Sequence, residues 1–354
     1  DGNWSAIDPR NDLTSYVSSQ RLRIFRTMNG GQSARDITPP ASATTGFIAP
    51  FVLAPSDPKI IYAGRDVVFK SLNQGNSWQR TNGGRPLDGN PVLTLAVSPL
   101  NPDVVYAATA PVTSRARLFR SLDGGRSWEN ITGPLPDRYP MDIAVDPVNT
   151  ATVYVVFSGY GTPHVFRSMD GGNTWGDISA GLPDLPTSAV VIDPQFPEHV
   201  YVGNDLGVYL SKDGGDTWML YSEGLPEAVI AMDLSISPAN RMVRLATHGN
   251  GVYERSLASV DDPPAVATGF ALLQNYPNPF RDHTVVVYEV PEAQHVRLAI
   301  YDVRGRKVAT LVDGQVRAGR HAVPFDGGGL ASGIYVARLL AGEASASRTM
   351  VVAR

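Results

Sequence analysis

Hydrophobic and polar positions alternate in short runs along most of the chain. Segments rich in Val, Ile, Tyr and Ala follow turns that contain Pro, as in "SPLNPDVVYAAT" (98–109) and "DPVNTATVYVVF" (146–157). Apolar runs of this length, with turn residues on both sides, indicate β-strands. No long stretch places apolar residues at the helical period of 3.6 residues. The pattern therefore predicts an all-β fold.

A polar octet that ends in Trp punctuates these strands. It occurs in full as "SLDGGRSW" (121–128), "SMDGGNTW" (168–175) and "SKDGGDTW" (211–218), and in degenerate form as "SLNQGNSW" (71–78) and "TMNGGQSA" (27–34). Each repeat has the order strand, Pro turn, strand, loop, strand, octet and short strand. The tryptophans are roughly 40–50 residues apart, which is the spacing of four-stranded propeller blades. We therefore predict a β-propeller over residues 1–258.

The octet has the composition of a tight hairpin between the third and fourth strands of a blade. Gly adopts positive φ without a steric penalty, and an Asp or Asn side chain accepts backbone N–H bonds in the turn. The Trp ring supplies apolar area for packing. We expect these hairpins to lie on the same face as the Pro turns. A structural role is predicted for Ser121, Asp123, Gly125, Trp128, Ser168, Asp170, Gly172, Trp175, Ser211, Asp213, Gly215 and Trp218.

About six repeat units are visible. The first begins with two strands in "WSAIDPRNDLTSYVSS" (4–19), and the last, "MDLSISPANRMVRLATHGNGVYERSL" (232–257), contains three strands and no octet. A fourth strand for the last unit is not evident. One hypothesis is that one or more blades precede Asp1, so that the N-terminal part of the propeller is missing from this sequence. Circular closure with six complete blades would contradict that hypothesis.

The pattern changes after the last unit. Residues 259–269, "SVDDPPAVATG", have no strand alternation and are predicted to form a linker. Residues 270–354 contain about seven strand-like runs, in which Val296, Leu298 and Ile300 alternate with polar residues. "DVRGRKV" (302–308) is predicted to be a hairpin turn. Seven short strands in a segment of this size favour an immunoglobulin-like β-sandwich.

The octet resembles the Asp box, the bacterial neuraminidase repeat. Similar repeats occur in sialidases, in the sortilin ectodomain and in xyloglucan-degrading propeller glycosidases. The resemblance covers roughly residues 1–258 and implies a propeller, but it is nearly silent on chemistry. In sialidases the Asp boxes lie away from the active site, so the octet Asp residues are not expected to be catalytic. A sialidase would also need a Tyr–Glu pair, and no such pair can be assigned from the spacing of these residues. Sialidase activity is therefore not expected.

The C-terminal segment resembles the type A sorting domain of the type IX secretion system. Two mild departures are Phe325, where Trp is usual, and Arg354, where Lys is usual. The resemblance implies passage through the periplasm of a Gram-negative bacterium, contact with the secretion machinery and its processing peptidase, and a secreted or surface-anchored product. The residues that match the sorting signal are Asn275, Pro277, Asn278, Pro279, Phe280, Gly305, Gly333 and Tyr335.

Composition excludes several classes of function. The net charge is −4, so no basic surface favours nucleic acid or an anionic membrane as a partner. The chain has no Cys, which excludes thiolate metal sites and Cys nucleophiles. No apolar run has the length of a membrane span. "DGG" precedes a strand and not a helix, so it is no phosphate loop, and the oxygen series of a calcium loop is absent. No cofactor or metal is predicted.

Candidate ligand-binding residues lie in loops on the face opposite the octets. Asp66 and Asp205 occupy equivalent places three blades apart, and a glycoside hydrolase needs two carboxyl groups about 5–10 Å apart. Each is also explained as a polar loop residue. His164 and His248 show no metal-ligand spacing and are expected to be solvated. The binding candidates are Arg65, Arg115, Tyr160, His164, Asn204 and His248.

Two functional hypotheses remain open. The first is a secreted or cell-surface propeller that binds a glycan or a protein through its loop-rich face, since loops on a rigid base are the usual place of recognition. The second is an extracellular glycoside hydrolase that acts on a polysaccharide. The sequence favours the first and does not name the ligand. A purely structural surface protein is a third option.

Overall fold

The computed structural model describes residues 2–226, 228–257, 269–275, 278–281, 283–316, 318–342 and 344–353. The chain divides into two compact units. The first comprises residues 1–179 and 186–200, and the second comprises residues 180–185 and 201–354.

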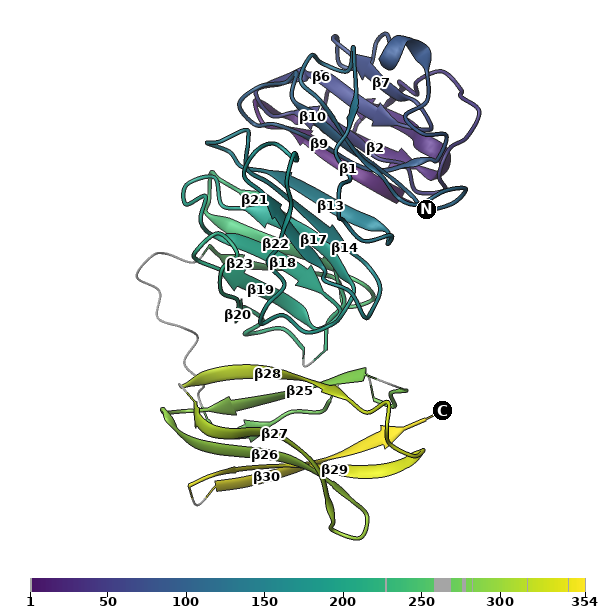
Figure 1. The fold of residues 1–354 in the computed structure, drawn as a ribbon. Helices are drawn as coiled ribbons and strands as arrows, with labels where there is room; N and C mark the ends of the chain where they lie inside the picture. The colour runs from purple at the N-terminus through teal and green to yellow at the C-terminus, as the bar shows by residue number, and fades with distance from the viewer. Residues whose placement is uncertain are drawn as a thin grey trace. The chain divides into compact units, whose positions relative to one another are not determined.

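The first unit consists of successive antiparallel sheets whose strands follow one another in sequence order (Figure 1). Each of its sheets has four strands, as predicted, and the fourth strand is always a short one of two residues. The bounds are β1 (Gly2–Asp8), β2 (Asn11–Ser19), β3 (Arg23–Thr27) and β4 (Arg35–Asp36); β5 (Phe51–Ala54), β6 (Asp57–Gly64), β7 (Val68–Ser71) and β8 (Gln79–Arg80); β9 (Val92–Val97), β10 (Val105–Thr109), β11 (Leu118–Ser121) and β12 (Glu129–Asn130); β13 (Pro140–Val145), β14 (Val153–Phe157), β15 (Val165–Ser168) and β16 (Gly176–Asp177). Strand β17 (Thr187–Ile192) also belongs to this unit.

The second unit contains the later strands of the repeat region. The fifth sheet has the order β17-β18-β19-β20, with β18 (Val200–Asn204), β19 (Gly207–Ser211) and β20 (Met219–Leu220). The sixth sheet has three strands, β21 (Ala231–Ser237), β22 (Met242–Thr247) and β23 (Val252–Ser256). Among the described residues, no strand pairs with the outer edge of β23. The three-stranded last unit was predicted from the sequence.

The second strand of a sheet explains the continuous apolar runs in the sequence. Every residue of β10, β14 and β18 is buried, because these strands are covered on both faces. A strand that is buried on both faces shows a continuous apolar run and not alternation. Side chains from neighbouring sheets share one core, and Tyr106 and Val155 are both fully buried in the cluster formed by the third and fourth sheets.

The octets join the third and fourth strands, as expected. They also lie at the same end of the sheet as the Pro turns. The N–H of Gly171 donates to the carbonyl of Ala151 at 2.7 Å, and the N–H of Gly124 donates to the carbonyl of Asp103 at 2.9 Å. The loops between second and third strands are therefore at the opposite end, since adjacent strands are antiparallel.

The C-terminal residues form two further sheets with seven strands, as the sequence predicts. One sheet has the order β24-β25-β28 and the other β27-β26-β29-β30. Their inward side chains build one core in which Val296, Leu298 and Ile300 are fully buried, which confirms the alternation. The bounds are β24 (Ala271–Leu272), β25 (His283–Val290), β26 (Gln294–Asp302), β27 (Lys307–Val316), β28 (Gly319–Asp326), β29 (Gly333–Ala341) and β30 (Ala344–Val352).

The predicted turn at 302–308 is also present. The N–H of Gly305 donates to the carbonyl of Asp302 at 2.9 Å, and Gly305 has a φ of +76°. The predicted linker lies almost entirely outside the described residues. No helix within the described ranges has the length and apolar character needed to cross a membrane.

Candidate functional site

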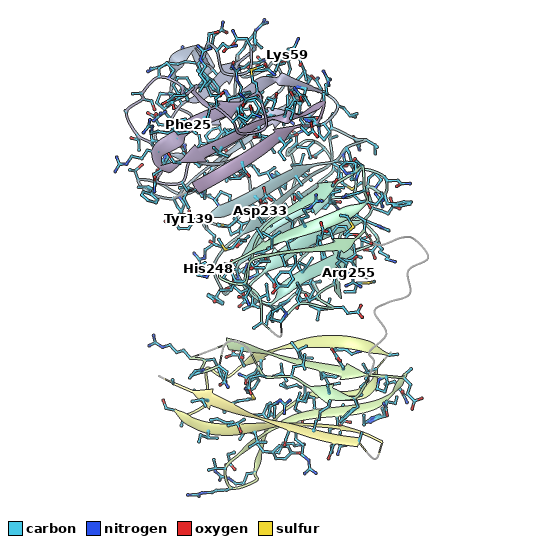
Figure 2. The ribbon with its side chains drawn as sticks, turned by 180° about the vertical axis from the view of Figure 1, so that it is seen from behind. Phe25, Lys59, Tyr139, Asp233, His248 and Arg255 are labelled. Carbon is cyan, nitrogen blue, oxygen red and sulfur yellow. The ribbon has the colours of Figure 1, made fainter. Side chains whose placement is uncertain are left out.

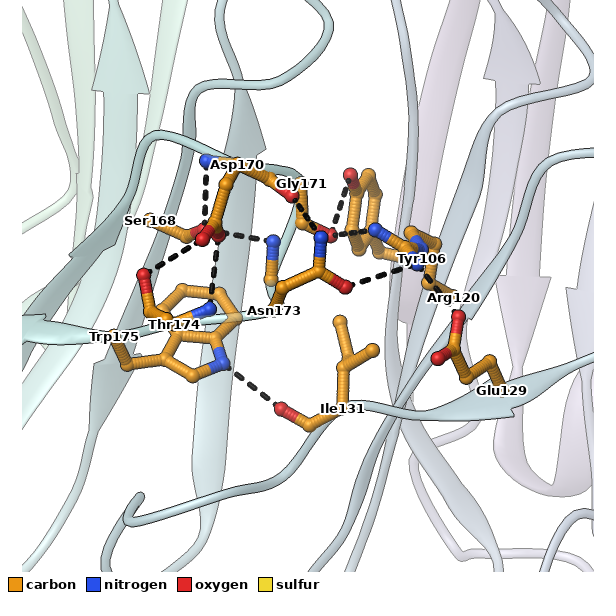
Figure 3. Close-up of polar contacts among 11 residues, drawn as sticks. Tyr106, Arg120, Glu129, Ile131, Ser168, Asp170, Gly171, Asn173, Thr174 and Trp175 are labelled. Carbon is orange, nitrogen blue, oxygen red and sulfur yellow. Dashed lines mark hydrogen bonds and ion pairs between the residues drawn. The ribbon is translucent and has the colours of Figure 1, made fainter.

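The octet hairpin is closed by its own polar side chains. In the octet 168–175 the hydroxyl of Ser168 bonds with Asp170 Oδ1 at 2.8 Å and accepts the N–H of Gly172 at 2.7 Å. Asp170 also accepts the N–H of Thr174 at 2.9 Å and its hydroxyl at 2.7 Å (Figure 3). The octets 121–128 and 211–218 repeat this set of bonds.

The hairpin also fastens its sheet to the preceding one. The indole Nε1 of Trp175 donates to the carbonyl of Ile131 at 2.8 Å (Figure 3). The carbonyl of Gly171 accepts bonds from Arg120 Nη1 at 2.9 Å and from the Tyr106 hydroxyl at 3.3 Å. The polar atoms of this octet are thus engaged in bonds within the protein, which explains them without a substrate.

The octet carboxylates lead to a prediction about acid stability. Bonds from Ser127 lower the pKa of Asp123 to about 2, and bonds from the backbone and side chain of Thr174 do the same for Asp170. A carboxyl whose folded pKa lies below the unfolded value of about 3.9 stabilises the fold above that value. This contribution is lost as the pH falls from about 4 to about 2. We expect the unfolding temperature to fall over that range, and to fall less in a variant with Asp123→Asn and Asp170→Asn.

Asn is a suitable replacement for Asp at these positions, because Asn73 in the degenerate octet 71–78 accepts bonds from the equivalent hydroxyl and N–H groups, those of Ser71 and Ser77. The measurement is the thermal midpoint at several pH values between 5 and 2. Equal losses in the wild type and the double variant would show that these carboxylates do not drive acid unfolding.

The pair Arg65 and Asp66 is buried, with 8% and 3% of its surface exposed. Arg65 Nη1 donates to Thr45 Oγ1 at 2.8 Å, and Asp66 Oδ1 accepts the N–H of Val67 at 3.1 Å. These bonds hold the connection between β6 and β7. Asp66 is therefore placed inside the protein and not at an open ligand-binding surface.

The expectation that His164 is solvated is wrong. Its side chain is buried with 2% exposure, and its Nδ1 lies 3.3 Å from the carbonyl of Phe157. His164 directly precedes β15, and its ring packs inward beside the end of β14. His248 is exposed, as expected. Arg115 is exposed and donates from Nη2 to the carbonyl of Leu135 at 2.8 Å.

Two exposed tyrosines gather at the loop end of the fourth sheet. Tyr160, predicted from the sequence, is 47% exposed, and Tyr139, labelled in Figure 2, is 46% exposed. Their connections run together, because the N–H of Ser158 donates to the carbonyl of Tyr139 at 3.0 Å. Gly159 has a φ of +98° and lies against the side chain of Arg138, which a Cβ would approach to 2.9 Å. We call Arg138, Tyr139 and Tyr160 the loop patch.

The second unit contains two Asp side chains whose pKa is raised. Burial raises the pKa of Asp205, which follows β18, and burial also raises the pKa of Asp233 in β21, although Asp233 retains contact with solvent. Asn204 is buried; its Oδ1 accepts the N–H of Leu206 at 2.9 Å, and its Nδ2 has no hydrogen-bond partner among the described residues. Among all the residues that the structure describes, no group of three or more His, Asp or Glu side chains is arranged to hold a metal ion.

Sequence reasoning missed Tyr139, Asp142 and Asp233. Asp142 and Asp233 follow Met at corresponding places in the first strands of their sheets, in "PMDIAV" and "AMDLSIS". The repeated Met-Asp pair would have identified them. Asp142 accepts the N–H groups of Ile143 and Val190, at 2.8 and 3.0 Å. Tyr139 had no pattern of its own.

Two sorting-signal residues near the start of the C-terminal domain, Asn278 and Phe280, bond to its last strand, β30. Asn278 Oδ1 accepts the N–H of Val351 at 2.8 Å, and the N–H of Phe280 donates to the Val351 carbonyl at 2.9 Å. Phe280 is buried in the core, and Asn275 Nδ2 donates to Thr284 Oγ1 at 2.9 Å.

The remaining signal residues have simpler roles. The hydroxyl of Tyr335 donates to the carbonyl of Ala331 at 3.0 Å, and Gly333 has a φ of +155°. Pro279 follows Asn278 through a cis peptide bond. Pro277 lies outside the described residues.

Comparison with known families identifies the C-terminal part. Residues 274–353 match the family described as the secretion system C-terminal sorting domain. The chain therefore carries a type IX secretion sorting domain and is exported to the cell surface or the extracellular space of a Gram-negative bacterium. Among curated proteins, no sequence matches the chain.

Solved structures identify the fold of the repeat region as a β-propeller. One is an ancestral GH74 enzyme, with a TM-score of 0.57 and 16% identity, covering 98% of this chain and 62% of the other. Another is the Niastella koreensis GH74 enzyme, with a TM-score of 0.57 and 14% identity, covering 100% of this chain and 66% of the other.

A third structure is PorZ, a surface component of the type IX secretion system of Porphyromonas gingivalis, with a TM-score of 0.51 and 14% identity, covering 100% of this chain and 59% of the other. The chain thus spans less than two thirds of the length of each of these proteins. At these identities the likeness establishes the fold alone.

Proposed function

We propose that this protein is an extracellular binding protein whose propeller recognises a glycan or a protein through the loops opposite the octets. The loop patch is the observation that carries the proposal. Two half-exposed tyrosines and an arginine from adjoining connections form an amphipathic surface on a rigid sheet. Exposed aromatic side chains with a neighbouring Arg are typical of binding surfaces, because they provide contact area at low entropic cost.

The propeller and the tail have separate tasks in this proposal. Residues 1–258 bind the ligand, and residues 270–354 direct export and are removed by the processing peptidase after translocation. The octets stabilise the sheets and take no part in recognition, since their polar groups bond within the protein.

Ligand binding can be tested with a glycan array and with labelled surface proteins of the producing bacterium. We expect Tyr139→Ala and Tyr160→Ala each to lower the affinity for any ligand found in this way tenfold or more. Met169→Ala is a matched control, because Met169 is 67% exposed on the octet face of the same sheet. Binding that is unchanged by both tyrosine substitutions would contradict the proposal.

The second candidate function is glycoside hydrolysis, which the raised pKa values of Asp205 and Asp233 favour. The general acid of a glycoside hydrolase is a carboxyl group with a raised pKa, and desolvation shifts the pKa of Asp205 and Asp233 in that direction. Two of the structurally similar proteins are GH74 enzymes. Asp66 does not fit a catalytic role, because it is buried and accepts the N–H of Val67.

A panel of polysaccharides distinguishes the two functions. Under the binding proposal we expect no release of reducing ends from any substrate. If hydrolysis occurs and is lost in Asp205→Asn or Asp233→Asn while Asp66→Asn retains it, the protein is a glycoside hydrolase and our preference is wrong.

A further inference from the structure

Each junction between sheets in the first unit holds a tryptophan. Trp78 Nε1 donates to the carbonyl of Ile37 at 2.7 Å, Trp128 to Thr81 Oγ1 at 3.2 Å and Trp175 to the carbonyl of Ile131 at 2.8 Å. The acceptor is always the residue directly after the fourth strand of the preceding sheet. The ring of Trp175 packs against the core that the third and fourth sheets share.

The sixth sheet has no such tryptophan. Val243 pairs with Arg255 where, in the fourth sheet, Val153 pairs with Ser168. Arg255 therefore stands at the position of the first octet residue, and no octet follows it in the sequence. Residues 258–268 contain no aromatic residue that would replace the ring.

A pocket of about 240 Å³ occupies the corresponding place, between the fifth sheet and β21–β23. Its apolar lining repeats the core around Trp175 position by position: Val208, Leu225, Leu234, Val243, Leu245 and Tyr253 correspond to Leu118, Leu135, Ile143, Val153, Val155 and Phe166. A smaller apolar cavity of about 150 Å³ accommodates benzene. The pocket therefore has room for an aromatic side chain.

The outer edge of β23 lies beside the pocket and can accept a further strand. In the fourth sheet the carbonyl of Val165 accepts the N–H of Ile178 beyond the fourth strand, and Val165 is fully buried. The corresponding Val252 is 70% exposed, and no strand covers it among the described residues. An unpaired edge with a neighbouring side-chain pocket is the arrangement used for β-strand addition.

Arg255 lines the pocket at the same junction. Its guanidinium carbon lies 4.1 Å from the centre of the Tyr221 ring, and Nη2 pairs with Glu223 at 2.9 Å. Tyr221 follows β20 as Ile131 follows β12, so Arg255 takes over part of the contact that a tryptophan makes elsewhere. Arg255 Nη1 is buried without a hydrogen-bond partner in the described part of the chain, and a carbonyl group of an incoming peptide would satisfy it.

We propose that this junction binds an extended segment of a separate polypeptide, which pairs with β23 and inserts an aromatic side chain, with Trp preferred, into the pocket. The partner would thus supply the two parts that the other sheets receive from their own octets. This site is distinct from the loop patch and does not depend on the proposed function.

A labelled peptide with the sequence of residues 168–179, "SMDGGNTWGDIS", tests the proposal against the 354-residue chain by fluorescence anisotropy. We expect saturable binding that is at least tenfold weaker when the Trp of the peptide is replaced by Ala. Val252→Pro in the protein should also weaken binding at least tenfold, since the corresponding N–H of Val165 donates to Ser179 Oγ at 3.0 Å and Pro has no N–H to donate. The thermal midpoint of Val252→Pro should stay unchanged, because the residue is exposed on an unpaired edge.

Leu225→Trp, which places a ring in the pocket from its own chain, should also prevent binding. No binding of the native peptide, or equal binding of the native and Trp-to-Ala peptides, would overturn the proposal. Sedimentation of the chain alone provides a further check. Self-association that Val252→Pro abolishes would mean that a second copy of this chain is the occupant, and the proposal of a separate partner would be wrong.

Discussion

Removal of residues 270–354 is expected to abolish appearance of the protein at the cell surface and in the medium, and to leave it in the periplasm. The physical reason is that the sorting domain is a folded unit whose signal residues are fixed by its core and by β30. Phe280 is buried in that core, and Asn278 bonds to Val351 near the chain terminus. Truncation removes this recognised surface completely. Cell fractionation followed by detection of residues 1–258 measures the effect.

Two controls make the result specific. Lys307→Arg retains charge at an exposed position of β27 and should leave secretion unchanged. Residues 270–354 fused to a periplasmic reporter should carry that reporter to the surface. Secretion of the truncated protein at the level of the full chain would contradict the assignment of the sorting function to this segment.

Trp175→Ala is expected to destabilise the propeller by about 3 kcal/mol. The loss combines the packing of the half-buried ring against the shared core with its bond to the Ile131 carbonyl. Truncation of a large core aromatic residue costs about 3–5 kcal/mol, and this ring lies at the lower end because part of it remains in contact with solvent. Chemical denaturation of the full chain, followed by circular dichroism, gives the change.

Met169→Ala is the control for this measurement. Met169 belongs to the same octet but is 67% exposed, so its truncation should change stability by no more than about 0.5 kcal/mol. If both substitutions have the same small effect, the octet is a surface turn that contributes little to cohesion between sheets.

The repeated features of the fold could be predicted because their causes are local. The octet contains its own hydrogen-bond donors and acceptors within eight residues, so "SMDGGNTW" specifies a hairpin in any of the sheets. Within each sheet of the repeat region the strand order follows the sequence order, since each strand pairs with its neighbour in the chain. The tail could be assigned for a different reason, namely that its motifs match a family throughout its length.

The candidate site could be predicted only in part, because exposure depends on packing between segments. His164 and Tyr160 lie in the same connection, yet the first is buried beside the Phe157 carbonyl and the second is half-exposed. Polar residues in a loop do not reveal which of them points inward. Arg65 and Asp66 show the same limit, since the Thr45 hydroxyl that binds Arg65 comes from a distant connection.

The pocket beside β23 was not evident from the sequence for another reason. The absence of an octet after Ser256 was visible, but the consequence of that absence is a three-dimensional one. Six of the surrounding side chains, among them Val208 and Tyr253, remain apolar at positions that correspond to the core around Trp175, although the sixth sheet has no tryptophan there. This retained apolar lining supports the proposal that a partner's aromatic side chain occupies the pocket.

The most direct test of the account is a double-mutant cycle between Trp175 and Ile131, which belong to the octet of one sheet and the end of the preceding sheet. If the octets fasten neighbouring sheets, Trp175→Ala and Ile131→Ala should be coupled by about 1 kcal/mol or more, within the range of about 0.5–3 kcal/mol found for residues in contact. Because Ile131→Ala keeps the carbonyl that accepts the Trp175 N–H, the coupling measures the packing of the ring across the junction, and additive effects, within about 0.3 kcal/mol, would contradict that packing.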